Sequence, residues 1–565
     1  MRRGNTVSGT TVPEQGTRAE GFLAPPPTAQ TLPELLDACA AETPSSDALV
    51  SKTTRLTYAE LAAKSQVAAR VLHHLGVRED DAVALMAPNI AEWIPVAFGA
   101  MRCGARVDAF NTWAKAYDLD FLLRSSGASV LVMADRVRGT DLVAQLRALI
   151  PEIDDPGPLR STRFPNLRHV LVIGDDHPAA VSSWADLIDR HTTGTPIEEP
   201  TGLGERVAYV LYTSGSTSTP KAVPLCHRDL LVNAFHIGER MGLSEQDRVW
   251  LGSPLFWSYG CANAALATMT HRACLVVQEQ FIATEAVDLM QRERVTAAYL
   301  LPAMIDALTT QCAEQMRAID SLRTGLTIGR PDTVQRAVVE LGVPEICNIY
   351  GSTETYGNCC VTDHRMSLAD RMATQGHPLP GVEIRLVDEE TGAVLPVGQA
   401  GEAQVRGRIT PGYLGDETAN AAAFTSHGWF RTGDRLMLNP DGTVSFVDRA
   451  TDMIKVSGIN VSPAEVESFL AEHPDVREVL VVGAPHPSKD EVAIAFVIPR
   501  SDRITPEELT RYCKERIAGY KVPWLISFVT ELPRTDTGKI ARRLLKPDAV
   551  VLVDAALAAE GAGTS

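Results

Sequence analysis

Residues 212–221 read Tyr212-Thr213-Ser214-Gly215-Ser216-Thr217-Ser218-Thr219-Pro220-Lys221, and they follow a predicted buried strand at 208–212. Backbone N–H groups and hydroxyls of such a loop can hydrogen-bond phosphate oxygens, and Lys221 adds positive charge. The Walker A spacing Gly-x-x-x-x-Gly-Lys-Ser/Thr is absent. By itself, a turn rich in serine and threonine is more often an ordinary solvated loop, so its interpretation depends on the rest of the chain.

Helix and strand patterns alternate on both sides of this loop. Helical periodicity is found at 58–75, 91–102 and 118–124. Short apolar strands are expected at 82–86, 105–110, 128–133, 170–173, 273–277 and 297–301. Alternation at this spacing predicts a parallel α/β sheet.

The pattern changes after residue 381, where short strands at 383–388, 401–406 and 443–448 are separated by turns such as Asp441-Gly442. A compact α/β unit follows residue 454. Its helices are expected to begin at Ser462-Pro463-Ala464-Glu465 and at Thr505-Pro506-Glu507-Glu508, which have the capping-box pattern with proline at the first helical position. We therefore expect a flexible tail at 1–30, a large domain at 31–449, a small domain at 450–548, and a tail rich in alanine and glycine at 549–565.

Composition excludes several classes of protein. The chain has 565 residues, of which 45% are hydrophobic and 22% charged, so it is globular. Its formal net charge of −17 argues weakly against nucleic acid as a partner. The ten cysteines include no Cys-x-x-Cys pair, which favours reduced thiols in a cytoplasmic protein over zinc ligands or a disulfide scaffold. No apolar run approaches the roughly 18 residues of a membrane-spanning helix.

Four further motifs follow the loop in a fixed order. They are Tyr350-Gly351-Ser352-Thr353-Glu354-Thr355, Trp429-Phe430-Arg431-Thr432-Gly433-Asp434, Asp448-Arg449 with Asp452-Met453-Ile454-Lys455 and Gly458, and Pro533-Arg534-Thr535-Asp536-Thr537-Gly538-Lys539-Ile540. Together with the loop they resemble the signature of the adenylate-forming superfamily, which includes acyl-CoA synthetases, luciferases and peptide-synthetase adenylation domains. The resemblance covers nearly all of residues 31–546.

The resemblance implies an α/β fold with a large multi-lobed N-terminal domain and a small mobile α+β C-terminal domain. The large domain would contain two α/β subdomains and a small β-barrel-like subdomain. Such enzymes join a carboxylate to AMP, release pyrophosphate and transfer the acyl group to a thiol, and the small domain changes orientation between the steps. Residues 458–463 resemble those of stand-alone CoA ligases, so CoA is the expected acceptor, with a carrier-protein thiol as the alternative.

The same resemblance assigns a nucleotide site. Tyr350 would lie on the adenine with Gly329 beside it, and Asp434 would bind the ribose with Arg449 nearby. Thr353 would contact the α-phosphate, and Glu354 would ligate Mg²⁺, which prefers oxygen ligands. The ATP phosphates would be bound by the loop residues Thr213, Ser214, Gly215, Ser216, Thr217 and Lys221.

Lys539 resembles the lysine that reaches the acyl carboxylate and the α-phosphate, and it would be catalytic together with Thr353 and Glu354. Thr451 occupies the hinge position, and Gly458 would let the thiol arm of CoA pass close to the backbone. The acyl pocket would include Trp257, Tyr259, Arg330 and Gly351. Their mostly apolar character predicts a hydrophobic acid, which could be fatty, aryl or polycyclic.

Some positions depart from the family pattern. Ser218 and Ala222 replace glycines of the phosphate loop, Trp257 stands where many members have histidine, and Ile328 and Arg330 replace small residues. One interpretation is family drift. The other is impaired adenylation, in which the enzyme only thioesterifies an acyl-adenylate supplied by a partner adenylating enzyme, although the intact Lys539 argues against complete loss. Two further alternatives for the function are a catalytically silent nucleotide-binding homologue and a luciferase-type oxygenase. Among partners, a second copy of the chain in a homodimer is considered as well.

Overall fold

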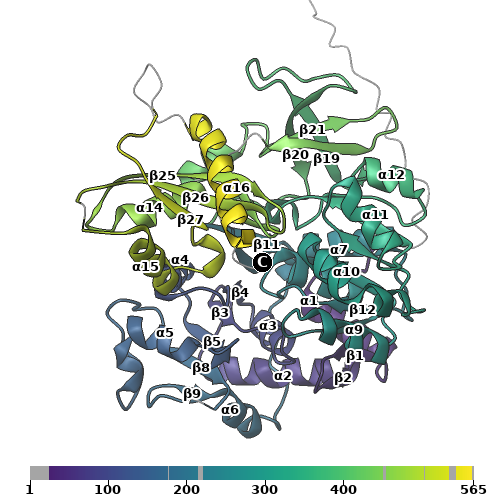
Figure 1. The fold of residues 1–565 in the computed structure, drawn as a ribbon. Coiled ribbons are helices and arrows are strands. Elements are labelled where there is room, and N and C mark those ends of the chain that lie inside the picture. Colours follow the sequence, from purple (N-terminus) through teal and green to yellow (C-terminus); the bar gives the residue numbers. More distant parts are fainter. Residues whose placement is uncertain are drawn as a thin grey trace, which may run out of the picture.

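The computed structural model describes residues 25–175, 177–213, 220–449, 453–501, 503–533 and 542–562. Two large sheets, a small antiparallel sheet and a separate C-terminal sheet form the framework of this part of the chain, with helices packed around them (Figure 1). The α/β class and the division into a multi-lobed large domain and a small domain are therefore confirmed.

The larger sheet has nine strands in the order β18-β17-β16-β15-β14-β12-β13-β1-β2. Its six central strands are parallel, and its outer strands pair antiparallel. The early hairpin thus joins strands that lie some two hundred residues later in the chain. The bounds are β1 Asp47–Val50, β2 Arg55–Thr57, β12 Arg248–Leu251, β13 Cys274–Val277, β14 Ala297–Leu300, β15 Thr324–Thr327, β16 Glu345–Tyr350, β17 Cys360–Val361 and β18 His377–Pro378.

The second sheet has seven strands in the order β11-β10-β4-β3-β5-β8-β9, and it is parallel except for the β10–β11 pair. Strands β10 and β11 flank the Ser/Thr-rich loop, so the two ends of this loop lie at one edge of the sheet. The bounds are β3 Ala82–Met86, β4 Arg106–Ala109, β5 Val130–Ala134, β8 His169–Ile173, β9 Ser182–Ser183, β10 Val207–Thr213 and β11 Lys221–Cys226.

Helices separate the two sheets. Helix α2 contacts β1 and β2 of the larger sheet, α3 contacts β3 and β4 of the other, and α2 and α3 pack against each other. Inner strands such as β3 and β5 are covered on both faces, and every one of their residues is apolar and buried. The helices of the large domain are α1 Leu32–Glu42, α2 Tyr58–His74, α3 Trp93–Arg102, α4 Ala116–Ser126, α5 Leu142–Leu149, α6 Trp184–Arg190, α7 His227–Met241, α8 Ala265–Thr270, α9 Ala283–Arg292, α10 Pro302–Arg317, α11 Pro331–Val339, α12 Leu368–Ala373 and α13 Glu417–Ala423.

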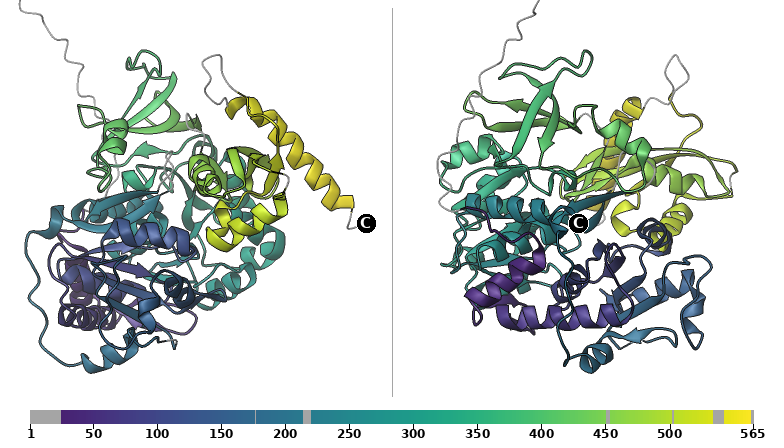
Figure 2. Two further views of the ribbon diagram at one scale, coloured as in Figure 1. Left: turned by 90° about the vertical axis from the view of Figure 1, so that its left-hand side faces the viewer. Right: turned by 180° about the vertical axis from the view of Figure 1, so that it is seen from behind.

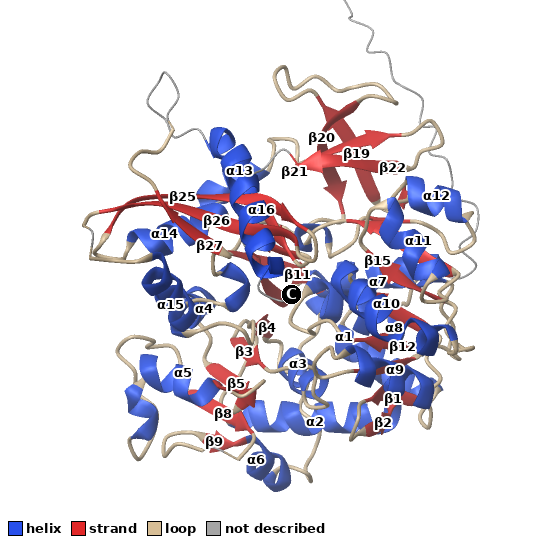
Figure 3. Cartoon of the chain, viewed as in Figure 1, coloured by secondary structure: helices blue, strands red, loops and turns tan. Residues whose placement is uncertain are grey.

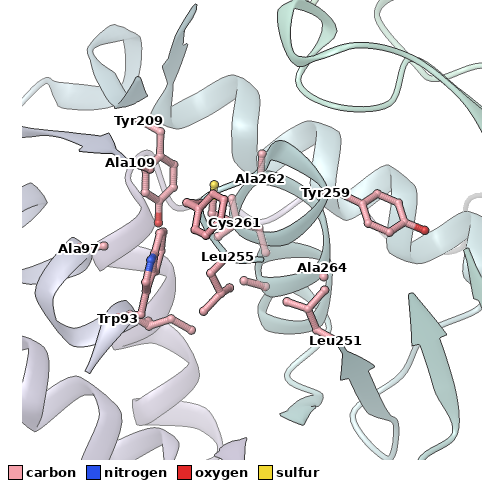
Figure 4. Close-up of a cluster of buried hydrophobic side chains, with 14 of the residues drawn as sticks. Trp93, Ala97, Ala109, Tyr209, Leu251, Leu255, Tyr259, Cys261, Ala262 and Ala264 are labelled. Carbon is pink, nitrogen blue, oxygen red and sulfur yellow. The ribbon is translucent and has the colours of Figure 1, made fainter. Parts of the chain in front are cut away.

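One continuous cluster of buried apolar side chains fills the large domain. Figure 4 shows a part of it, in which Trp93 of α3 and Tyr209 of β10 face Leu255 and Cys261 of the other α/β subdomain. The rings of Trp93 and Tyr209 lie 5.9 Å apart between centroids. The two α/β subdomains therefore share a single core.

The small β subdomain is a four-stranded antiparallel sheet of β19 Val382–Val387, β20 Ala400–Gly407, β21 Phe430–Leu438 and β22 Val444–Arg449. Figure 3 shows these strands standing apart from the helices of the α/β body. The change of pattern predicted after residue 381 corresponds to this sheet. Its buried residues, such as Leu436, still belong to the core of the large domain.

The C-terminal domain is a five-stranded sheet of β23 Ile454–Val456, β24 Ile459–Val461, β25 Val476–His486, β26 Asp490–Pro499 and β27 Leu525–Phe528. Helices α14 Pro463–Ala471 and α15 Pro506–Arg516 cover one face, and α16 Lys546–Ala562 packs against β25 on the other (Figures 1 and 2). Thr505 forms the predicted reciprocal capping box with Glu508 at the start of α15. Ser462 caps α14 by accepting from the Glu465 amide, while the Glu465 side chain, predicted to complete a capping box, binds Lys521.

Helix α16 occupies most of the segment 549–565 that the sequence predicts to be a tail. Ala549 and Val553, four residues apart, are 0% and 1% exposed because they pack into the apolar face of the sheet. The residues predicted as an N-terminal tail are described only from residue 25 onward, where the carbonyl of Pro27 accepts a hydrogen bond from Arg228. No helix in the described part of the chain is long and apolar enough to cross a membrane.

Candidate active site

The two ends of the phosphate loop are paired across strands. Thr213, at the end of β10, is the cross-strand partner of Lys221, the first residue of β11. The loop residues Ser214, Gly215, Ser216 and Thr217, together with Ser218, lie outside the described residues. Ala222 is buried within β11, and its carbonyl accepts a hydrogen bond from the Leu414 amide at 3.0 Å. The position at which alanine replaces the glycine of the family pattern therefore lies within a regular strand.

Tyr413 joins two of the predicted site residues. The Lys221 ammonium lies 4.5 Å from the centroid of the Tyr413 ring, and the Tyr413 hydroxyl donates a hydrogen bond to Glu354 Oε1 at 3.0 Å. Burial and the Glu354 carboxylate raise the pKa of Tyr413, so it remains a hydroxyl donor. No sequence motif singles out Tyr413, although glycines at 412 and 415 mark the turn that carries it.

Glu354 and Thr353 lie in a short 3₁₀ turn, Thr353–Thr355, that follows β16. The Thr410 amide donates to the Glu354 carbonyl at 2.7 Å, which fixes the turn against the β subdomain. The Thr353 hydroxyl lies 3.3 Å from Ser258 Oγ. This turn therefore faces both the Lys221 side of the site and the segment that carries Trp257.

Tyr350 and Asp434 come together from two subdomains. The Tyr350 hydroxyl, at the end of β16, donates to Asp434 Oδ2 on β21 at 2.9 Å. Burial, followed by the Asp434 charge, raises the pKa of Tyr350 well above its usual range. Arg449 is the cross-strand partner of Asp434 in β22. The predicted adenine and ribose residues thus lie next to one another.

Gly329 and Gly351 follow neighbouring strands of the nine-stranded sheet. The buried Asn348 side chain bonds Gly329 in both directions, since Oδ1 accepts from its amide and Nδ2 donates to its carbonyl, each at 3.3 Å. A Cβ at Gly351 would lie 2.4 Å from the Gly357 carbonyl oxygen, so this position excludes a side chain. Asn348 is another residue that the sequence analysis missed, because a lone asparagine in a strand carries no local signal.

The predicted acyl-pocket residues differ in their surroundings. Tyr259 is 6% exposed and donates to the Leu326 carbonyl at 3.0 Å, so its hydroxyl is bound within the core. Trp257 is half-buried, and its ring centroid lies 5.3 Å from that of Trp113. Arg330 is exposed at the start of α11. The structure therefore does not place Arg330 in a closed wall with Trp257 and Tyr259.

Gly458 adopts a φ of +84° in the turn between β23 and β24, and its amide donates to Asp490 Oδ2 at 3.1 Å. No atom lies within 4 Å of an added Cβ, so its backbone conformation explains the glycine better than crowding does. Thr451 and Lys539, the predicted hinge and catalytic lysine, lie outside the described residues.

Comparisons with known proteins identify the family of this chain. The family model described as AMP-binding enzyme matches residues 36–414, and the model described as AMP-binding enzyme C-terminal domain matches residues 465–539. The putative acyl-CoA synthetase YngI of Bacillus subtilis is 33% identical over 91% of this chain and 96% of that protein. The mitochondrial medium-chain acyl-CoA ligase ACSF2 of Bos taurus is 28% identical over 92% of this chain and 87% of that protein.

Among solved structures, o-succinylbenzoate CoA synthetase (MenE) of Bacillus subtilis is similar in two states. A double mutant bound to the product analogue OSB-NCoA gives a TM-score of 0.77 at 27% identity, covering 90% of this chain and 97% of that one. The same enzyme in complex with AMP gives 0.62 at 28% identity, covering 91% and 98%. The chain belongs to the AMP-binding enzyme family of the adenylate-forming superfamily, and it is an acyl-CoA ligase of the AMP-forming type.

Proposed function

We propose that this enzyme converts a hydrophobic carboxylic acid to its CoA thioester through an acyl-adenylate, using ATP and Mg²⁺. The observation that carries this proposal is the contact series Lys221–Tyr413–Glu354, which joins the flank of the phosphate loop to a buried carboxylate. A fixed cation and a fixed carboxylate close together are what a nucleoside triphosphate with its metal requires.

The residues present fit Mg²⁺ bound mainly through substrate. Among the described residues there is no group of three or more His, Cys, Asp or Glu side chains that could hold a metal by themselves. Mg²⁺ commonly takes one or two carboxylates plus substrate phosphates, and Glu354, oriented by Tyr413, would be the protein ligand. The metal would neutralise phosphate charge, while Thr213, Lys221 and the loop between them hold the phosphate oxygens.

The nucleotide would bind between Tyr350 and Asp434. In this proposal Tyr350 lies on the adenine between Gly329 and Gly351, and Asp434 accepts from the ribose hydroxyls with Arg449 nearby. The Tyr350–Asp434 hydrogen bond would hold that carboxylate in place before the nucleotide arrives. The complex of the similar enzyme MenE with AMP supports nucleotide binding by this chain.

For the acyl group we propose a pocket next to Trp257 and Thr353. Thr353 would contact the α-phosphate, and its link to Ser258 would place the reacting carboxylate close to the aromatic segment. The mostly apolar surroundings favour a hydrophobic acid, as the name of the medium-chain ligase ACSF2 does. Lys539 would stabilise the charge that develops during adenylation, and Thr451 would be the hinge, both on the strength of their motifs.

CoA is the proposed acceptor, and the OSB-NCoA complex of MenE supports this choice. Gly458 would line the passage for the thiol arm, since it lies in a turn where no atom is within 4 Å of an added Cβ. Two departures from the family pattern favour drift over impaired adenylation, because Ala222 lies within β11 and Arg330 is exposed.

A paired assay tests the proposal. One tube contains ATP, Mg²⁺, CoA and one of hexanoate, octanoate, decanoate or benzoate, and the other contains the matching synthetic acyl-adenylate and CoA. Thioester formation in both tubes, with pyrophosphate released in the first, is expected. Thioester from the acyl-adenylate alone would show that adenylation is impaired, whereas nucleotide binding without thioester in either tube would contradict the proposed function.

A further inference from the structure

The C-terminal domain docks on α4 and on the segment that precedes it. Helix α15 lies beside α4 (Figure 1), and the turn after α15, Ala518 to Lys521, enters the contact. The Asn111 side chain donates to the Tyr520 hydroxyl at 3.1 Å, and the ring centroids of Trp113 and Tyr520 are 5.8 Å apart. This turn is therefore a principal contact point between the two domains.

At its centre, Lys521 is bound by carboxylates of both domains. Its ammonium donates to Asp118 Oδ1 of α4 and to Glu465 Oε1 of α14, each at 2.6 Å. The second oxygen of Asp118 accepts from the Ala518 amide at 3.0 Å. All three charged side chains are buried, with 8% exposure for Asp118, 6% for Glu465 and 5% for Lys521.

These contacts have different consequences when the domains separate. Glu465 belongs to the same domain as Lys521, so this pair survives any reorientation. Asp118 belongs to the large domain, so its two bonds exist only while the domains are docked in this way. Docking takes the Asp118 carboxylate out of water, which is strongly unfavourable unless Lys521 and the Ala518 amide meet it, so Asp118 is selective for this orientation.

The docked turn also contacts the proposed acyl pocket through aromatic rings. Trp113 lies edge-on to Tyr520 on one side and 5.3 Å from Trp257 on the other. Phe256 packs on Trp113 as well, at 5.6 Å. The position of the C-terminal domain is thereby linked to the segment that carries Trp257 and Ser258.

The two MenE structures differ in how well they match this arrangement. The one with the CoA product analogue gives a TM-score of 0.77, and the one with AMP gives 0.62. Since both are the same enzyme with nearly equal coverage, the present arrangement of domains is closer to the first conformation.

We propose that Asp118 is a positioning residue for thioester formation: by holding Lys521 and the Ala518 amide, it fixes the C-terminal domain in the orientation used for the second half-reaction. This inference rests on the proposed function. It concerns domain orientation alone, because Asp118 binds Lys521 and the Ala518 amide and is not one of the residues proposed to bind nucleotide or acyl group. Adenylation, which uses the other orientation, does not require this contact.

The test measures the two half-reactions separately in the full-length enzyme. Adenylation is followed as acid-dependent exchange of labelled pyrophosphate into ATP, with the best acid of the panel above. Thioester formation is followed in single turnovers from the matching synthetic acyl-adenylate and CoA. Asp118→Asn keeps the size of the side chain and leaves the Lys521–Glu465 pair intact. It is expected to slow thioester formation by about tenfold or more through loss of the docked population, while exchange stays within about twofold.

Three variants control the result. Asp120→Asn alters a carboxylate on the same helix that pairs with Arg124 and Arg163 at the surface, and it should change neither half-reaction. Asp118→Glu restores the charge and should recover part of the lost rate. Lys521→Met should add little to the loss of thioester rate in the double variant, because both changes remove the same interdomain bond, while the loss of the Lys521–Glu465 pair should lower the thermal stability of the C-terminal domain as well.

The outcomes separate this inference from the proposed function. Absence of thioester with the unaltered enzyme would overturn the proposed function itself. With an active enzyme, equal loss in both half-reactions, or no loss in either, would overturn the role of Asp118. A loss of thermal stability in Asp118→Asn equal to that in Lys521→Met, without a difference between the half-reactions, would likewise assign it a merely structural role.

Discussion

Inside the large domain, the two α/β subdomains and the β subdomain share one continuous apolar cluster, whereas the C-terminal domain has its own two clusters on the faces of its own sheet. The C-terminal domain meets the large domain through a buried ion pair, hydrogen bonds and a few aromatic rings. Apolar burial is non-directional and strong over a large area, while ion pairs and hydrogen bonds depend on one geometry. Apolar burial therefore holds the subdomains of the large domain together permanently. The ion pair and hydrogen bonds can stabilise one orientation of the C-terminal domain and still break when it reorients.

The largest effect is expected from a substitution within the shared core of the large domain. Trp93→Ala removes a fully buried ring that packs near Tyr209, and it should lower the free energy of unfolding of the large domain by about 3–5 kcal/mol. Both half-reactions should then be lost together on warming. Calorimetry alongside the two assays measures this, and separate loss of one half-reaction would contradict a single cooperative core.

A second change tests the junction with the β subdomain at the proposed metal ligand. Tyr413→Phe removes the hydrogen bond to Glu354, and the outer partner of a metal ligand typically contributes about 10–100-fold. Pyrophosphate exchange should fall by that factor and require more Mg²⁺, with Glu354→Gln causing a greater loss. An unchanged Mg²⁺ dependence in Tyr413→Phe would argue against Glu354 as the ligand.

The pH dependence of stability probes one buried polar contact of the large domain. His227 accepts a hydrogen bond from the Leu32 amide through Nδ1, and burial lowers its pKa from 6.5 to about 3. The unfolded chain therefore binds a proton below pH 6.5 that the folded protein excludes. Stability present above that pH is lost as pH falls towards 3, by about 1.4 kcal/mol per pH unit at most. Denaturant titrations at several pH values should show that the free energy of unfolding of His227→Asn falls less steeply with decreasing pH than that of the unaltered protein. An equally steep fall would contradict this assignment.

The smallest expected effect is at the edge of the domain contact. Tyr520→Phe removes the hydrogen bond from Asn111 but keeps the ring against Trp113. One such bond contributes about 0.5–1.5 kcal/mol, so thioester formation should slow by roughly 2–10-fold and adenylation should not. Tyr117→Phe removes an exposed bond to Glu472 of the same interface and serves as the matched control. An equal effect of the two variants would mean that burial does not matter at this contact.

Much of the proposed site could be predicted from the sequence because its members belong to short motifs. Tyr350, Thr353 and Glu354 are adjacent in the chain, and Thr213 and Lys221 flank one loop. Tyr413 and Asn348 were missed, since each acts through a partner that comes from another strand or turn. The roles of all these residues stay predictions, and Lys539, Thr451 and most of the loop also lie outside the described residues.

The sequence by itself determined the family, the α/β class and the caps of α14 and α15, and its motifs contain the residues proposed for the chemistry. These features depend on neighbours within a few positions, where residue type and periodicity act directly. Only the tertiary structure brought the early hairpin β1–β2 into the nine-stranded sheet and packed α16 over the C-terminal domain. It also placed Lys521 against Asp118, 403 positions away. Such contacts depend on the packing of whole elements. The residues around one carboxylate in a helix do not indicate which distant residue will pair with it.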